Sequence, residues 1–296
     1  MKERMLIRLN SLLVKIFFIA FITAISNSAY SEEKKIEFIK NDWSFEGIFG
    51  TFDRSSLQRG YQVYQEVCSG CHSIQHLSYR NLSEKGGPEF SLDEAKAIAA
   101  QFEITDGPND DGEMFTRPRR LSDKFVNPFL NVQAATAANG GAYPPDMSVI
   151  VKARKGGADY IYSLLLGYEE VPAEYELDDG VYYNKYIPGN KIMMFKPLSE
   201  EAVEYSDGTQ ATEAQMAKDV TTFLTWAAEP NLEARHKMGF KVIIFLIILL
   251  TLVYFSKQKV WSRLDSKDDS NQKEETFDKV ERAVTEYEGE DPKTFK

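Results

Sequence analysis

The stretch EVCSGCHSIQ, residues 66–75, contains both cysteines of the 296-residue chain, Cys68 and Cys71. His72 follows the second cysteine directly and is one of only three histidines. A C-x-x-C pair can form a redox disulfide, supply half of a zinc site or attach a haem. The surrounding sequence has to decide among these three kinds of site.

The neighbouring residues argue against zinc and against a thioredoxin-like site. Zinc takes about four ligands, and Cys68, Cys71, His72 and His76 would be four. Adjacent residues on a helix point about 100° apart, so Cys71 and His72 do not easily close one site. A thioredoxin-like site expects a βαβ context, which the sequence lacks. C-x-x-C-H instead predicts covalent haem attachment, with thioethers to both thiols and His72 as an iron ligand.

The iron of such a haem has a second axial position. His76 lies one turn beyond His72 on the same side of the ring, and His236 adjoins an apolar run, so neither suits the opposite face. Methionine or an open position remains, and we expect the loop KIMMFKP (residues 191–197) to supply a methionine. His/Met ligation is typical of an electron carrier. The candidate methionines are Met114, Met147, Met193 and Met194.

The two ends of the chain carry targeting and membrane signals. Residues 1–31 have a basic start, an apolar run and small residues, which predicts a secretory signal peptide. The apolar run at 238–255 would be about 27 Å long as a helix, close to the hydrocarbon thickness of a bilayer. We therefore expect an exported domain at 32–237, one transmembrane helix at 238–255 and a charged cytoplasmic tail at 256–296.

The acidity of the chain lies in the expected exported domain. Residues 32–237 hold 21 Lys and Arg against 33 Asp and Glu, a net charge of −12, within a whole-chain net charge of −10. This charge argues against nucleic acid as a partner and favours a basic protein partner. The candidate acidic clusters are Glu169, Glu170, Glu174, Glu176, Asp178 and Asp179, and separately Asp106, Asp110, Asp111 and Glu113.

Hydrophobic periodicity predicts a mostly α-helical exported domain with long loops. One helix has Asp53 as its N-cap and ends near Cys68, and another begins at Ser91 with a capping box. Further helices are expected at 132–138 and 212–230, and two more within 146–168, separated by Gly156 and Gly157. The rest of 105–145 and all of 171–198 are expected to be loops. Met216, Val220, Phe223, Leu224 and Ala227 form the apolar stripe of the 212–230 helix.

Several stretches resemble the cytochrome c1 family, the haem subunits of quinol–cytochrome c reductase (bc1) complexes. These are RGYQVYQEVCSGCHS at 59–73, AANGGAYPPDMSVIVKARKGGADYIYSLLLGY at 137–168, YYNKYIPGNKIMMFKPL at 182–198 and KDVTTFLTWAAEP at 218–230. The resemblance covers roughly residues 40–262 in the same order. It implies a mostly α cytochrome c-like haem domain with one C-terminal transmembrane helix.

The resemblance also implies roles for single residues. Cys68 and Cys71 would hold one haem c, His72 would be the proximal iron ligand and Met194 the distal one. Family members usually have small residues or proline around the distal methionine, whereas here Met193 precedes it, so Met193 is a rival. The implied pocket consists of Asn139, Ala142, Pro144, Pro145, Tyr160, Leu164 and Leu165, with Arg154 facing a propionate.

The function implied by the resemblance is outer-sphere electron transfer without acid, base or nucleophilic catalysis by this chain. The haem would accept electrons from a Rieske iron–sulfur protein and pass them to a c-type cytochrome, in a dimeric complex with cytochrome b. The resemblance places the chain in a bacterial inner membrane, with the haem domain in the periplasm and the C-terminus in the cytoplasm. The alternatives are a monohaem subunit of a terminal oxidase and a haem-based ligand sensor.

Overall fold

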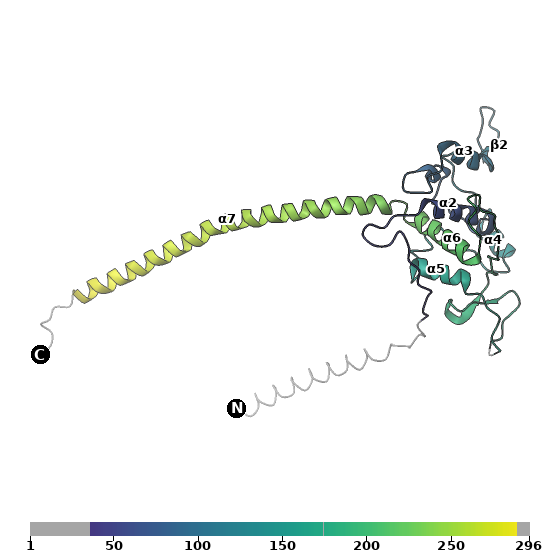
Figure 1. Cartoon of the computed structure of the whole chain (residues 1–296). Helices are drawn as coiled ribbons and strands as arrows, with labels where there is room; N and C mark the ends of the chain where they lie inside the picture. Colours follow the sequence, from purple (N-terminus) through teal and green to yellow (C-terminus); the bar gives the residue numbers. More distant parts are fainter. Residues whose placement is uncertain (1–35, 174, 289–296) are drawn as a thin grey trace, which may run out of the picture.

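The computed structural model describes residues 36–173 and 175–288, and the predicted signal peptide at 1–31 lies outside them. Figure 1 shows a helical domain from which one long helix, α7 (Leu232–Glu288), projects. The described strands are short and form two separate two-stranded sheets. The mostly α-helical class expected from the sequence is confirmed.

The core of the domain is the contact between α2 (Arg54–Val63) and α6 (Glu213–Ala228). A Cβ at Gly60 would lie 2.1 Å from the carbonyl oxygen of Asp219, so glycine is needed for the two backbones to approach this closely. The predicted apolar stripe of α6 is confirmed as core. All five of its members are buried: Met216, Val220, Phe223, Leu224 and Ala227.

The helix ends follow the capping residues that the sequence predicted. Asp53 accepts a hydrogen bond from the Ser56 N–H at the start of α2. Ser91 and Glu94 form a capping box at the start of α3 (Leu92–Ala100). The domain also contains α4 (Val132–Ala138) and α5 (Gly157–Leu166), and α5 packs against α6. Two short 3-10 helices lie at Tyr79–Ser83 and Pro188–Asn190.

The helix that leads into the C-x-x-C-H stretch changes its winding before it ends. After Val63, α2 continues as one π-helical turn, Tyr64–Cys68. Such turns often occur at functional sites. Cys68 therefore ends the helix, as the sequence predicted, and Cys71 lies in the following turn.

Three local expectations differ from the structure. Residues 148–155 form turns and a bend rather than a helix, with the Ala153 N–H shared between the carbonyl oxygens of Val149 and Ile150, and the positive φ values of Gly156 and Gly157, 98° and 58°, separate this segment from α5. The expected loop at 105–145 contains a hairpin of β1 (Glu103–Asp106) and β2 (Phe115–Pro118). The expected loop at 171–198 contains β3 (Tyr182–Tyr183) and β4 (Lys191–Ile192), which are too short to show a sequence period.

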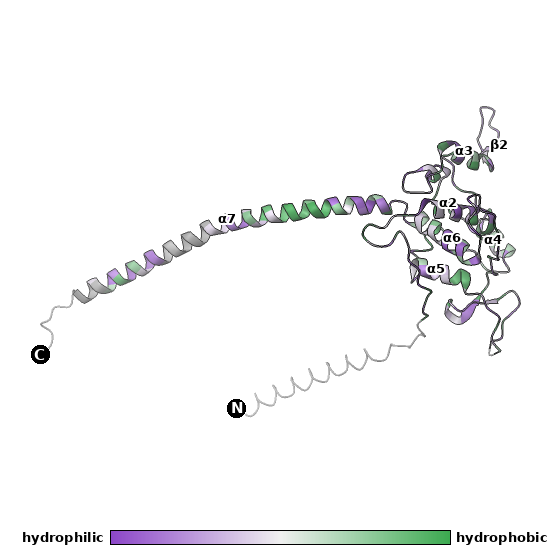
Figure 2. Ribbon diagram, viewed as in Figure 1, coloured by the Kyte–Doolittle hydropathy of each residue, from purple (hydrophilic) through white to green (hydrophobic). Residues whose placement is uncertain are grey.

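Three residues separate the end of α6 from the start of α7, which has 57 residues, or a length of about 85 Å. Its segment Leu232–Ser262 is long and apolar enough to cross a membrane, and none of its apolar window is buried within the described chain. Figure 2 shows this apolar stretch between polar segments of the same helix. The run predicted at 238–255 lies inside it, and the charged residues from 256 to 288 continue the helix.

Candidate functional site

One cavity of about 540 Å³ lies beside the C-x-x-C-H stretch. This volume is typical of a site for a small molecule or cofactor. The cavity is formed by the end of the α2 path, by residues 138–147, by α5 and α6 and by the 191–197 loop. It is lined by all twelve residues proposed from the sequence: Cys68, Cys71, His72, Asn139, Ala142, Pro144, Pro145, Arg154, Tyr160, Leu164, Leu165 and Met194.

The two cysteines and His72 share one turn of backbone. The N–H groups of Cys71 and His72 both donate to the carbonyl oxygen of Cys68, at 3.1 and 2.9 Å. The two cysteines do not form a disulfide with each other, and Cys68 is buried. Burial raises the pKa of the Cys68 thiol to about 12.

The imidazole of His72 is oriented by the backbone of Pro145. Its Nδ1 lies 2.8 Å from the Pro145 carbonyl oxygen, and because a carbonyl only accepts, Nδ1 carries the proton. Burial lowers the pKa of His72 and favours the neutral ring. The lone pair of Nε2 is then available to a metal ion, which is the usual arrangement of a ligating histidine.

Asp146 holds the proline loop against the histidine loop. Its carboxylate accepts hydrogen bonds from the Ser73 hydroxyl at 2.7 Å and from the N–H groups of Gln75 and Ser148 at 3.0 and 2.9 Å. Burial alone would raise the pKa of Asp146, but these hydrogen bonds keep it below its usual range. The ionised carboxylate therefore fixes the position of Pro145, and through it the ring of His72.

Three methionines line the cavity: Met147, Met193 and Met194. Met193 is 40% exposed, whereas Met194 is half-buried, and its carbonyl oxygen accepts a hydrogen bond from Tyr168 at 3.1 Å. Met114 is exposed and does not line the cavity. The choice between Met193 and Met194 as the distal ligand stays a prediction from the sequence.

The other candidates for ligands lie elsewhere. His76 is exposed and His236 lies in the first turns of α7, and neither lines the cavity. Within residues 36–173 and 175–288, no group of three or more His, Cys, Asp or Glu side chains is placed to hold a metal ion.

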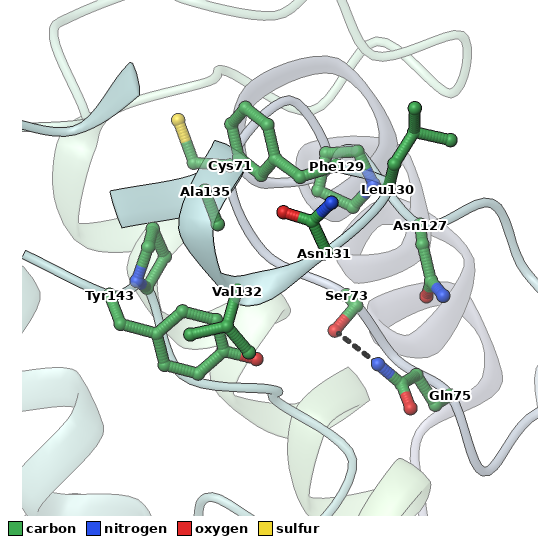
Figure 3. A pocket seen from close by; sticks show the side chains of 12 residues that line it. Cys71, Ser73, Gln75, Asn127, Phe129, Leu130, Asn131, Val132, Ala135 and Tyr143 are labelled. Atoms are coloured by element: carbon green, nitrogen blue, oxygen red, sulfur yellow. Dashed lines mark hydrogen bonds between the residues drawn. The ribbon is translucent and has the colours of Figure 1, made fainter. Parts of the chain in front are cut away.

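A second, smaller cavity of about 120 Å³ adjoins the first. The two share Cys71, Tyr143 and Pro144 in their linings. Figure 3 shows Cys71 on one side of the smaller cavity, with Ser73 and Gln75 joined by a hydrogen bond on another. We treat it as a side extension of the main site.

The larger acidic cluster borders the main cavity. Asp179 belongs to the cavity lining, and Glu169 forms an exposed ion pair with Lys185. Glu174 lies outside the described residues. In the second cluster, Asp106 pairs with Arg117 at the base of the β1–β2 hairpin, and Asp110 and Asp111 lie in its connecting turn, away from the cavity.

Sequence reasoning missed part of the apolar lining. Ile161 stands three and four positions before Leu164 and Leu165 on α5, so helical spacing would have found it. Val220 and Leu224 were predicted as core of α6, but they also line the cavity. Tyr182 and Ile187 come from the irregular region, where no period signals them.

Known proteins match most of the chain. Residues 43–264 match the model of the Cytochrome C1 family. The chain is 50% identical over 240 residues to "Cytochrome c1 2, heme protein, mitochondrial" of Arabidopsis thaliana, covering 81% of this chain and 77% of that protein. It is 45% identical over 256 residues to "Cytochrome c1" of Rhodospirillum rubrum, covering 81% and 93%.

A longer relative is "Cytochrome b/c1" of Bradyrhizobium diazoefficiens, which is 52% identical over 241 residues. The match covers 75% of this chain but 35% of that protein, so this chain spans about a third of its length.

Proposed function

Because the chain belongs to the cytochrome c1 family, we propose that it is the haem c subunit of a quinol–cytochrome c reductase (bc1) complex that carries electrons from a Rieske iron–sulfur protein to a c-type cytochrome. The observation that carries this proposal is the cavity of about 540 Å³, which is lined both by the C-x-x-C-H stretch and by the methionine loop. The name "Cytochrome b/c1" of one relative supports cytochrome b as a partner.

The residues of the cavity fit a covalently attached haem. The thiols of Cys68 and Cys71 would form its thioethers, and the Nε2 of His72 would ligate the iron. Met194 is our choice for the distal ligand. Arg154 is exposed at the cavity, and no carboxylate pairs with its guanidinium among the described contacts, so it is available to a propionate.

The work of this chain is to bind, orient and shield the cofactor. When bound, haem supplies a centre that takes up and releases one electron. The Pro145 carbonyl holds the imidazole of His72, and apolar side chains from α5 and α6, among them Leu165 and Leu224, exclude water from the pocket. Burial, axial ligation and hydrogen bonding to the ligands are the means by which a protein sets a haem potential.

The acidic cluster beside the cavity supports a basic electron acceptor. Asp179 is at the cavity itself, and Glu170, Glu176 and Asp178 lie exposed near it in the sequence. Negative charge around a redox site raises the rate of encounter with a positively charged partner, and this effect becomes smaller as the salt concentration rises.

Location and assembly follow from the same proposal. The segment Leu232–Ser262 of α7 would cross the bacterial inner membrane once, with the haem domain in the periplasm and the C-terminus in the cytoplasm.

The test of the proposed assembly is purification of the chain in mild detergent from membranes of its source. We expect a b-type cytochrome and a Rieske protein to co-purify, and quinol to reduce the haem in that preparation. A terminal oxidase co-purifying in their place would contradict the proposal.

A carbon monoxide titration of the reduced protein distinguishes the electron carrier from a haem-based ligand sensor. A site closed by methionine binds the gas slowly and incompletely, whereas a sensor needs an open or labile position. Rapid stoichiometric binding would contradict the electron-carrier function.

A further inference from the structure

The segment Ser44–Thr51 forms a closed loop at the start of the domain. Its neck is held by the hydrogen bond from the Thr51 N–H to the Ser44 carbonyl at 2.9 Å, and its tip by that from Gly50 to Gly47 at 3.3 Å. A Cβ at Gly50 would lie 2.2 Å from the Phe45 carbonyl oxygen, so the turn requires glycine there. The loop therefore has a defined shape.

The apolar residues of this loop divide into two groups. Phe45 and Phe52 are buried, and their rings pack together at the base of the loop. Ile48 and Phe49 at the tip are 74% and 78% exposed within the described part of the chain. Two large apolar side chains in water lack the favourable free energy that their burial would supply. Their adjacency on a fixed turn suggests that something else covers them.

The neighbour of the exposed tip is the membrane-crossing helix. The ring of Phe49 meets that of Phe240 edge to face, with centroids 6.3 Å apart. Phe240 belongs to the apolar segment Leu232–Ser262 of α7 and is itself exposed. In Figure 1 the purple loop near the start of the domain lies beside the first turns of α7. The side chains at the tip of the loop are thus continuous with the apolar surface of α7 at the point where this helix leaves the domain.

The base of the loop is fixed to the same helix. Glu233 in the first turn of α7 is buried and accepts a hydrogen bond from the Phe52 N–H at 3.0 Å. It also forms an ion pair with Arg54 at 2.8 Å. These contacts hold the loop and α7 in one orientation, so the height of the tip along the helix is set by the fold.

We propose that Ile48 and Phe49 insert into the lipid boundary beside α7, so that the haem domain touches the bilayer at a second point. The occupant of this surface is lipid, because the tip adjoins a helix surface that lipid covers if α7 crosses the membrane. Aromatic and aliphatic side chains on a fixed turn gain free energy at the interface in proportion to the apolar area that they bury. The proposal rests on α7 as the anchor but not on the electron partners.

The experiment replaces Phe49 by the photo-crosslinking analogue p-benzoylphenylalanine in the full chain, in its own membranes and with haem absorbance as the check of folding. Two matched positions accompany it. Phe245 lies in the apolar segment of α7 and reports lipid, and Leu130 is fully exposed on the domain and reports water.

After irradiation we expect lipid adducts at position 49, as at position 245, and several-fold fewer at position 130. A crosslink from position 49 to another polypeptide, or a lipid yield no higher than at position 130, would overturn the proposal. If position 49 fails this test while position 245 gives lipid adducts, α7 still crosses the membrane and only the contact of the loop with lipid is wrong. If position 245 also gives no lipid adducts, the membrane crossing by α7 is wrong as well.

Discussion

At the scale of single residues, the orientation of His72 depends on groups outside the C-x-x-C-H stretch. The ring of His72 is oriented by the Pro145 carbonyl, and Pro145 is held in place by Asp146. The tautomer of His72 that leaves Nε2 free for a metal ion is therefore set by a loop 73 residues away, which supplies the acceptor for Nδ1.

The two adjacent methionines differ enough to be separated by mutation. We expect Met194→Leu to abolish the weak long-wavelength absorption band of methionine–iron(III) ligation. The haem potential should fall by on the order of 0.1 V or more, since axial ligands set such potentials over about 0.8 V. Met193→Leu is the matched control and should keep both properties. The reverse pattern would assign the ligand to Met193.

Asp159 should make the stability of the domain depend on pH. Burial raises its pKa, but hydrogen bonds from Lys40 at 2.7 Å and Trp43 at 2.8 Å outweigh burial, and the net pKa lies below its usual value of 3.8. A lowered pKa gives stability that is present above the unfolded value and is lost as pH falls through the folded value.

We therefore expect Asp159→Asn to cost about 1–3 kcal/mol at pH 7, the range for hydrogen bonds to a charged group. The difference from the natural chain should shrink below about pH 4, where the unfolded carboxyl is protonated. Thermal unfolding in detergent at a series of pH values measures this, with the exposed Asp42→Asn as control. A cost that does not change with pH would show that charge is not the cause.

At the scale of elements, α2 and α6 are joined by a charged group inside their interface. Asp219 is fully buried and accepts hydrogen bonds from Arg59 at 2.8 Å and Ser56 at 2.6 Å. Arg59 also pairs with the exposed Asp207 at 2.7 Å. The two carboxylates share one guanidinium but differ in burial.

Removal of the buried partner should be the more costly change. We expect Asp219→Ala to lower the free energy of unfolding by about 3–5 kcal/mol, because it leaves the largely buried Arg59 without its main partner. Asp207→Ala should cost less than about 1 kcal/mol, as exposed ion pairs do. Urea unfolding of both variants measures the difference. If both variants lost the same free energy of unfolding, burial would not be what makes the ion pair of Arg59 with Asp219 stronger than that with Asp207.

The sequence predicted the elements whose signals are local. The cap at Asp53, the capping box at Ser91 and the stripe of α6 all depend on neighbours within a few residues. The first of the two helices predicted within 146–168 was wrong, because apolar spacing does not distinguish a helix from the consecutive turns found at 148–155. The bond between Phe52 and Glu233 joins residues 181 positions apart and has no local signal.

The candidate site was predicted more completely than the fold, and for a different reason. All twelve proposed residues line one cavity. They were chosen by their positions in stretches that resemble a known family, and such a resemblance includes contacts between residues far apart in the sequence. Ile187 and Val220 stand in stretches that resemble the family but were not predicted as lining, because that role depends on where the chain folds back.

At the scale of the whole molecule, charge is distributed unevenly around the cavity. The cluster near Asp179 borders the site, whereas the acidic turn of the β1–β2 hairpin does not. If a basic cytochrome docks over the cavity, only the first cluster should guide it.

We expect the double change Glu176→Lys and Asp178→Lys to lower the second-order rate of electron transfer to a basic cytochrome by about tenfold at low salt. The loss should diminish at 0.15 M ionic strength, where the Debye length is about 8 Å. Asp110→Lys with Asp111→Lys is the matched control and should change the rate little. Stopped-flow oxidation of the reduced protein measures both. A larger loss in the control pair would move the docking surface to the hairpin.

The junction between α6 and α7 is short and is held by ion pairs. Only residues 229–231 separate the two helices, and Glu229 pairs with both Lys152 and Arg235 across the gap. A three-residue linker with these ion pairs favours one orientation of the domain on α7. In the proposed electron transfer, the site would then keep its height above the membrane, and a donor and an acceptor protein would have to approach it.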